Sequence, residues 1–130
     1  MLTVKEVSKK FNISEYTLRY YTDENLIPSI KRDKNNIRIF DEESLNWLKT
    51  IICLRKCGMS IKSIKEYVDL CIIGDSTILQ RLDIINSQKV IIDKKIQELK
   101  ESSLFLEKKK DLYDDIIKNN KKDITNPNNW

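Results

Sequence analysis

The sequence predicts an all-α protein with a small β-hairpin wing, in which a winged helix-turn-helix domain is followed by a long dimerising coiled-coil helix. Three observations lead to this prediction. The 130 residues include only two glycines and two prolines, so few positions interrupt helices. Two short segments with helix-capping residues lie close together near the N-terminus. Further along the chain, an apolar seam recurs at heptad spacing.

The first two elements are short helices joined by a tight turn. Thr3 followed by Glu6 forms a capping-box pattern, which predicts a helix over about residues 4–10. Residues 12–14 are the expected turn, and a second helix is expected over about residues 15–24. Such a pair is typical of a helix-turn-helix, whose second helix lies in the major groove of DNA. The alternative interpretation is a plain helical hairpin with a tyrosine-rich face.

The second helix carries most of the candidate DNA contacts. Ser14 can cap this helix, and Leu18 is its expected inward anchor. Hydroxyl, guanidinium and phenol groups bind phosphates and base edges. The DNA-binding residues predicted here are Ser14, Tyr16, Thr17, Arg19, Tyr20 and Tyr21.

A basic hairpin is predicted after this helix. Pro28 forces the preceding residue out of helical geometry, so the helix ends before it. Residues 33–36 have turn composition, and apolar and polar residues alternate over 37–40, as in a strand. A hairpin in this position is a wing that grips phosphates, with Lys31 and Arg38 as the expected contacts. The alternative is a solvated surface loop.

Two further helices complete the predicted domain. Asp41 caps the third helix, which Gly58 ends, and a fourth helix is expected over residues 61–73. Lys56 and Lys62 lie at the corner between these helices. We expect them to form a second contact with the phosphate backbone.

A single long helix is predicted from residue 76 or 77 to about residue 118. Of twelve heptad positions, nine are apolar, which is a strong coiled-coil signal. The helix would be about 63 Å long at 1.5 Å per residue, so the small domain cannot cover it and a second copy is the expected partner. The spacing does not distinguish parallel from antiparallel pairing. The apolar seam positions are Ile78, Leu82, Ile85, Ile92, Ile96, Leu99, Leu106, Tyr113 and Ile117.

These elements predict three parts: a winged domain over 1–75, a dimerisation helix over 76–118 and a polar, frayed tail over 119–130 with Trp130 as a possible local anchor. The alternative for the long helix is a loose scatter of apolar residues. A second apolar stripe is expected to pack on the globular part, either of the same chain or of its partner. It comprises Ile84, Ile91, Phe105 and Leu112.

Composition bears on function mainly by exclusion. The chain has no histidine, which is the commonest general base and zinc ligand, and no glycine-rich phosphate loop. We therefore expect no enzymatic activity, no metal and no cofactor. No apolar run is long enough to cross a membrane, and a cytoplasmic protein is expected. Two other interpretations are a scaffold that only dimerises and an excisionase-like architectural DNA-binding protein, although the basic wing and the five heptads respectively argue against them.

Several motifs together resemble the MerR family of bacterial transcription regulators. They are Thr-Leu-Arg-Tyr-Tyr at 17–21, Leu-Ile-Pro at 26–28, Ile-Arg-Ile-Phe at 37–40, the corner over 54–60 and the terminal coiled coil. The resemblance implies a homodimer joined by an antiparallel coiled coil, with two winged domains on an inverted repeat. It also implies distortion of a promoter with an overlong spacer, so that RNA polymerase can use it.

One departure from the family pattern lies in the wing. The usual glycine-aromatic-arginine-aromatic-aromatic sequence is replaced here by Asn36-Ile37-Arg38-Ile39-Phe40. The wing keeps its arginine but loses two aromatic residues.

The segments around Cys53 and Cys71 resemble the short branch of this family that responds to aldehydes and related electrophiles without a C-terminal effector domain. In that branch the residue at the Cys53 position is the proposed sensor, and a thiolate attacks a carbonyl carbon directly. The alternatives are that Cys53 is one more apolar residue packed in the third helix, and that the protein binds DNA constitutively without thiol sensing. Cys57 is expected at the surface and Cys71 in the core.

Overall fold

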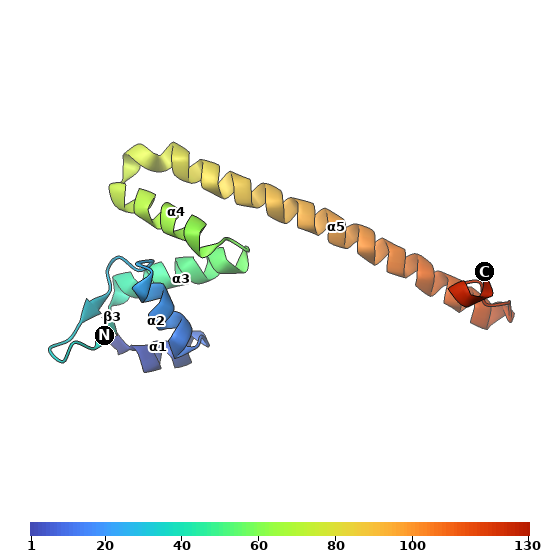
Figure 1. The fold of residues 1–130 in the computed structure, drawn as a ribbon, viewed down its shortest axis with the longest axis horizontal. Helices are drawn as coiled ribbons and strands as arrows, with labels where there is room; N and C mark the ends of the chain where they lie inside the picture. Colours follow the sequence, from blue (N-terminus) through green and yellow to red (C-terminus); the bar gives the residue numbers. More distant parts are fainter. The chain divides into compact units, whose positions relative to one another are not determined.

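The computed structural model describes all 130 residues and is mainly helical (Figure 1). The predicted fold class is confirmed: four shorter helices and a small sheet precede one long helix. The elements are β1 (Leu2–Thr3), α1 (Val4–Phe11), α2 (Glu15–Asp23), β2 (Lys31–Arg32), β3 (Arg38–Phe40), α3 (Glu42–Lys56), α4 (Ile61–Ile73), the 3-10 turn η1 (Asp75–Thr77), α5 (Ile78–Asn119) and the 3-10 turn η2 (Pro127–Asn129).

The sheet has one strand more than the predicted hairpin. β2 and β3 pair antiparallel, with Lys31 opposite Ile39. β1 pairs with the other side of β3, with Leu2 opposite Phe40, so the strand order is β1-β3-β2. The two residues of β1 tie the start of the chain to the wing, and Thr3 then caps α1 with the full capping box.

Local capping interactions set the helix boundaries. Asp41 accepts a hydrogen bond from the backbone of Ser44 at the start of α3, and Ser60 caps α4 in the same way. Gly58 has a φ of 81° at the corner between these helices. A residue with a Cβ atom rarely adopts this conformation, so glycine permits the sharp turn.

The chain divides into two compact units, Met1–Lys89 and Val90–Trp130. The first unit extends beyond the predicted boundary at residue 75 because the start of α5 belongs to it. Ile84 packs against the core, and Gln88 Nε2 donates a hydrogen bond to the carbonyl oxygen of Cys57 at 2.6 Å. Ile84 therefore packs as the second stripe predicts, whereas its three other residues are exposed in the protomer.

The core of the first unit joins every helix of the winged domain. Twelve hydrophobic residues are buried, and eight of them have an exposed fraction of zero. They are Val4, Val7, Leu18, Tyr21, Leu26, Ile27, Phe40, Leu48, Ile51, Met59, Ile64 and Val68. This packing fixes the orientation of α2 against α1 and α3.

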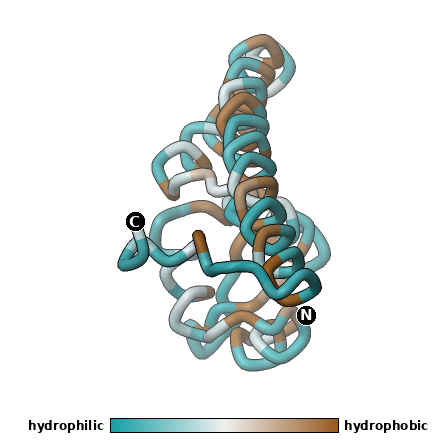
Figure 2. The backbone as a smooth tube through the Cα atoms, turned by 90° about the vertical axis from the view of Figure 1, so that its right-hand side faces the viewer, coloured by the Kyte–Doolittle hydropathy of each residue, from teal (hydrophilic) through white to brown (hydrophobic).

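The second unit is the greater part of α5 with the tail. Hydrophobic and hydrophilic positions alternate along α5 (Figure 2). The tail differs from the frayed segment predicted: Thr125 is buried, and its backbone N–H donates to Asp123 Oδ1 at 2.8 Å. Trp130 is 82% exposed, and its Nε1 donates to the carbonyl oxygen of Ile124 at 2.9 Å. Local hydrogen bonds therefore order this segment, and Trp130 anchors it through one of them.

The packing of α2 leads to a stability prediction. Replacing Leu18 with alanine should lower the free energy of unfolding by about 2–5 kcal/mol, because the methyl groups removed are fully buried. Replacing Tyr16, which is 80% exposed on the same helix, should change it by less than about 0.5 kcal/mol. Urea unfolding at equal protein concentration measures both values, and similar losses for the two variants would contradict the packing described.

Candidate nucleic-acid interface

The turn before α2 is held by side-chain hydrogen bonds. Asn12 adopts left-handed geometry with φ of 52° and ends α1, while Ser8 Oγ donates to the carbonyl oxygen of Ile13. Ser14 caps α2 by accepting a hydrogen bond from the backbone N–H of Thr17 at 3.0 Å. The Ser14 hydroxyl also donates to Thr17 Oγ1 at 2.7 Å, so the first turn of α2 is ordered before any ligand binds.

The outward face of α2 presents most of the predicted contacts. Tyr16 is 80% exposed and Tyr20 is 41% exposed. Arg19 is exposed and forms a long ion pair with Glu15 at 3.4 Å, which leaves its guanidinium largely in solvent. These groups form one surface that can meet phosphates and base edges.

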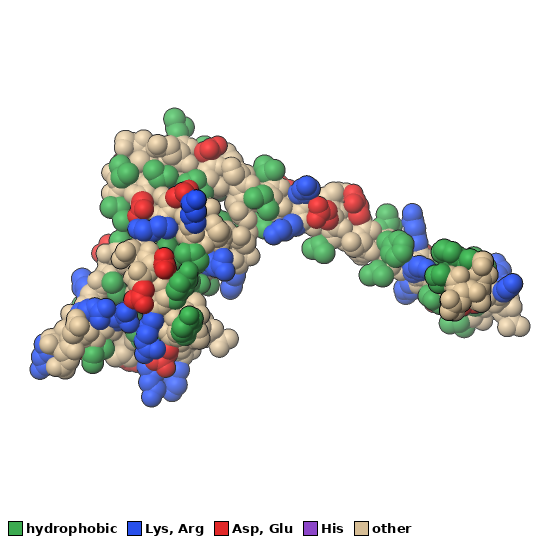
Figure 3. All heavy atoms as spheres, viewed as in Figure 1, with side chains coloured by type: hydrophobic (Ala, Val, Ile, Leu, Met, Phe, Trp, Pro, Cys, Tyr) green, Lys and Arg blue, Asp and Glu red, His purple; other side chains and the backbone are tan.

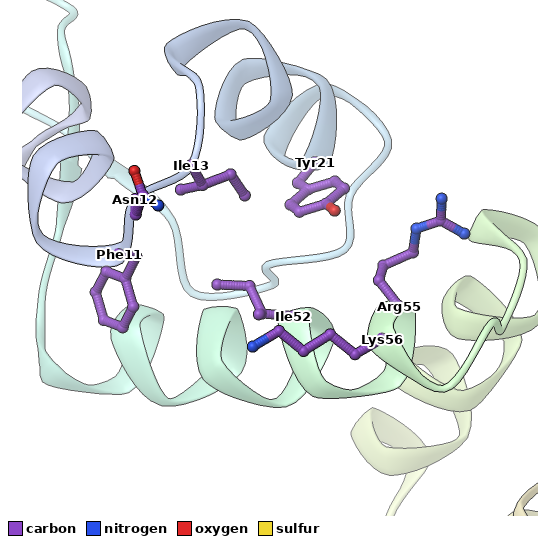
Figure 4. Close-up of a pocket in the computed structure, with 7 residues that line it drawn as sticks. All are labelled: Phe11, Asn12, Ile13, Tyr21, Ile52, Arg55 and Lys56. Atoms are coloured by element: carbon purple, nitrogen blue, oxygen red, sulfur yellow. The ribbon is translucent and has the colours of Figure 1, made fainter.

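Tyr21 is placed differently from its neighbours. Its side chain is only 7% exposed, because residues 18, 21 and 22 lie at helical spacing on the inner face of α2. The ring therefore belongs to the core. Its hydroxyl end lies at the hollow shown in Figure 4.

Two ion pairs join the wing to the helices. Lys31 Nζ lies 2.6 Å from Asp41 Oδ2, and Arg38 Nη2 lies 2.6 Å from Asp23 Oδ1. The hydrogen bond from Lys31 holds the pKa of Asp41 well below its ordinary value, helped by the backbone and hydroxyl of Ser44, and the same contact raises the pKa of Lys31. The charges of both predicted wing contacts are thus balanced within the domain.

The tip of the wing is a tight, hydrogen-bonded turn. Asp33 Oδ1 accepts from the backbone N–H groups of Asn35 and Ile37, at 2.8 and 3.0 Å. Asn36 has a φ of 61°, and its carbonyl oxygen accepts from Arg32 Nη1 at 2.9 Å. Basic side chains are prominent on this part of the surface (Figure 3).

A hollow of about 290 Å³ lies between α2 and the wing. Four basic side chains line it, from α1, α2 and both wing strands, together with the carboxylate of Glu15. Only Arg19 and Arg38 of these four were predicted as DNA contacts. Lys5 and Arg32 were missed, because the folding of β1 and the wing brings them to this site. The lining residues are Thr3, Val4, Lys5, Glu15, Arg19, Arg32, Asn36, Ile37 and Arg38.

The corner between α3 and α4 places the remaining predicted contacts, Lys56 and Lys62, at the surface, and neither forms an ion pair. Arg55 Nη1 donates to the carbonyl oxygen of Met59 at 2.7 Å and braces the corner. A hollow of about 620 Å³ lies beside it (Figure 4). Its lining residues are Phe11, Asn12, Ile13, Tyr21, Ile52, Arg55 and Lys56.

The three cysteines are free thiols in different surroundings. Cys53 and Cys57 are exposed, so in the protomer Cys53 is not the buried packing residue that one interpretation expected. Cys71 is half-buried rather than part of the core, and its Sγ lies 3.9 Å from Arg81 Nη1. Burial, together with the neighbouring Cys71, raises the pKa of Tyr67.

Other kinds of site are not apparent. No three or more His, Cys, Asp and Glu side chains are grouped so as to hold a metal ion. None of the helices has the length and apolar character needed to span a membrane.

Comparisons with known proteins agree with this arrangement. Residues 2–71 match the family model for the MerR HTH family regulatory protein. An uncharacterised HTH-type transcriptional regulator of Haemophilus influenzae is 40% identical over 111 residues, which cover 85% of this chain and 82% of that protein. The HTH-type transcriptional regulator AdhR of Bacillus subtilis is 38% identical over 88 residues, covering 68% and 63% of the two chains.

Solved structures show the same fold. HiNmlR, a MerR family regulator lacking the sensor domain, was crystallised bound to promoter DNA; it is 38% identical, with 88% of this chain and 90% of that chain covered and a TM-score of 0.76. A MerR family regulator from Listeria monocytogenes is 32% identical, with 88% and 86% covered and a TM-score of 0.80. The chain therefore belongs to the MerR family of DNA-binding transcriptional regulators.

Proposed function

We propose that this regulator acts as a homodimer that binds an inverted repeat and distorts a promoter with an overlong spacer. The observation that carries the proposal is the exposed seam of α5. Apart from the half-buried Ile92, its residues are 38–79% exposed in the protomer, a range set by Ile85 and Ile117. A row of large apolar side chains in water is unfavourable, and a second copy of the helix would cover it.

Antiparallel pairing of two copies would generate a two-fold axis across α5. Each copy would then present one α2 helix to one half-site, so an inverted repeat would match the symmetry of the protein. The promoter-bound relative HiNmlR supports the DNA-binding part of this proposal. RNA polymerase would be an indirect partner, because the regulator would act on the shape of the promoter DNA.

The dimer can be tested with two matched substitutions in α5. Leu99→Asp places a charge in the seam, where the side chain is 70% exposed in the protomer and would be buried by a partner. Gln97→Asp introduces the same residue outside the seam, where Gln97 contacts only Glu101 within its own helix. Light scattering should give a dimer mass for the wild type and Gln97→Asp and a monomer mass for Leu99→Asp at micromolar concentration. A wild-type monomer, or dimers in all three proteins, would contradict the proposed seam.

A response to electrophiles through Cys53 forms the finer part of the proposal. The thiol is exposed on α3, where an aldehyde can reach it. Addition of the sulfur to the carbonyl carbon, with a proton passing to the carbonyl oxygen, would give a hemithioacetal without any oxidant. The added group would alter how α3 packs in the dimer and thereby the angle between the two DNA-binding domains.

The test is Cys53→Ser in a reporter strain carrying the chain's own upstream region. Formaldehyde or methylglyoxal should change transcription with the wild type and with Cys57→Ser, which removes another exposed thiol, but not with Cys53→Ser. Mass spectrometry should locate the wild-type adduct on Cys53. An unchanged response in Cys53→Ser would favour the other candidate function, a constitutive or architectural DNA-binding protein without thiol sensing.

A further inference from the structure

The wing carries an ion pair whose two residues come from different elements. Asp23 is the last residue of α2, and Arg38 begins β3. Their side chains meet at 2.6 Å although the residues are 15 positions apart. The pair therefore joins the end of α2 directly to the central strand of the wing.

The two partners have different exposures. The Arg38 side chain is only 20% exposed, while that of Asp23 is 61% exposed. Neighbouring groups and the carboxylate thus restrict the guanidinium to one region, and the carboxylate stays in contact with water. Asp23 makes no cap hydrogen bond in α2, whose C-cap residue is Glu24, so its one described side-chain partner is Arg38.

Arg38 also lines the hollow between α2 and the wing, with Arg19 and Arg32, whereas Asp23 is not among the lining residues. A guanidinium has five N–H donors in a fixed planar arrangement, and the pair with Asp23 uses Nη2. The remaining donors can bind a phosphate while the carboxylate keeps its contact.

We propose that Asp23 is a positioning residue, which holds the Arg38 guanidinium where it can bind a DNA backbone phosphate between α2 and the wing. The proposal rests on the proposed function, since it requires this surface to bind DNA. It adds to that function that an acidic residue, Asp23, favours DNA binding. Simple electrostatics predicts the opposite, because removing a negative charge near DNA should strengthen binding.

Glu24 provides a matched control. It is the next residue, it is exposed, and its side chain forms no ion pair or hydrogen bond. Glu24→Gln therefore changes the net charge by the same amount as Asp23→Asn and leaves the contact with Arg38 intact. Asp23→Glu retains the negative charge and tests whether a carboxylate at this position restores the DNA affinity.

The experiment measures binding of the full chain to two duplexes, one from the region upstream of its own gene and one of equal length with scrambled sequence, at several salt concentrations. Asp23→Asn should weaken binding to both duplexes by about three- to tenfold, because a phosphate contact is independent of sequence. It should also reduce the slope of log affinity against log salt by up to about one, as Arg38→Gln should. Glu24→Gln should bind as tightly as the wild type or more tightly, and Asp23→Glu should restore most of the affinity.

A double-mutant cycle tests whether Asp23 acts through Arg38. Asp23→Asn should cause no further loss when Arg38 is already glutamine. Binding of Asp23→Asn equal to that of Glu24→Gln, or an undiminished loss in the Arg38→Gln background, would overturn the proposal. Thermal melts that match the wild type would show that the variants are folded. If Asp23→Asn unfolds at a lower temperature, the DNA affinity of Asp23→Glu would decide whether the proposal holds. Failure of the wild type to prefer the upstream duplex would count against the proposed function alone. The phosphate contact of Arg38 is also measured by the binding of the variants to the scrambled duplex.

Discussion

The burial of Leu18 determines which side chains of α2 face outward. Leu18 has no exposed surface, and with Tyr21 it fixes the inner face of the helix. Helical geometry then places Tyr16, Arg19 and Tyr20 on the outer face. The Ser14 cap sets where the helix begins, so both the rotation and the start of α2 are fixed before any ligand binds. A preformed surface of this kind loses little side-chain and backbone freedom on binding.

The charges of the winged domain are better suited to holding the wing and α2 in position than to attracting DNA through a large net positive charge. The net charge of the chain is only +4, and two wing cations are paired with carboxylates at helix ends. Asp41 has two roles, because it caps α3 and also binds Lys31. The wing is therefore attached at both strands to the helices behind it. We infer that this attachment lets the wing and α2 meet the DNA backbone in a fixed geometry.

The features that the sequence predicted well are those determined by nearby residues. Capping by Thr3, Ser14 and Asp41 was predicted because each cap acts within one helical turn. The long helix was predicted because its seam repeats over five heptads. Motifs from residue 17 to residue 60 identified the family, and the comparisons confirmed it.

The features missed depend on contacts between distant segments. β1 has only two residues, too few for a strand pattern, and it forms only because Leu2 meets Phe40. The burial of Tyr21 could have been inferred from its spacing to Leu18, but its place beside Tyr20 suggested a shared outward role. The pair of Asp23 with Arg38 arises from the way the wing folds back on α2. Nothing in the spacing of the sequence marked these two residues as partners.

The central claim is that two copies of α2, joined through α5, bind one duplex as a unit. Hydroxyl-radical footprinting of the wild type on its own upstream region tests this claim most directly. Two protected segments related by an inverted repeat should appear together over the same range of protein concentration. Protection of a single half-site, or of two segments filled independently at different concentrations, would contradict it.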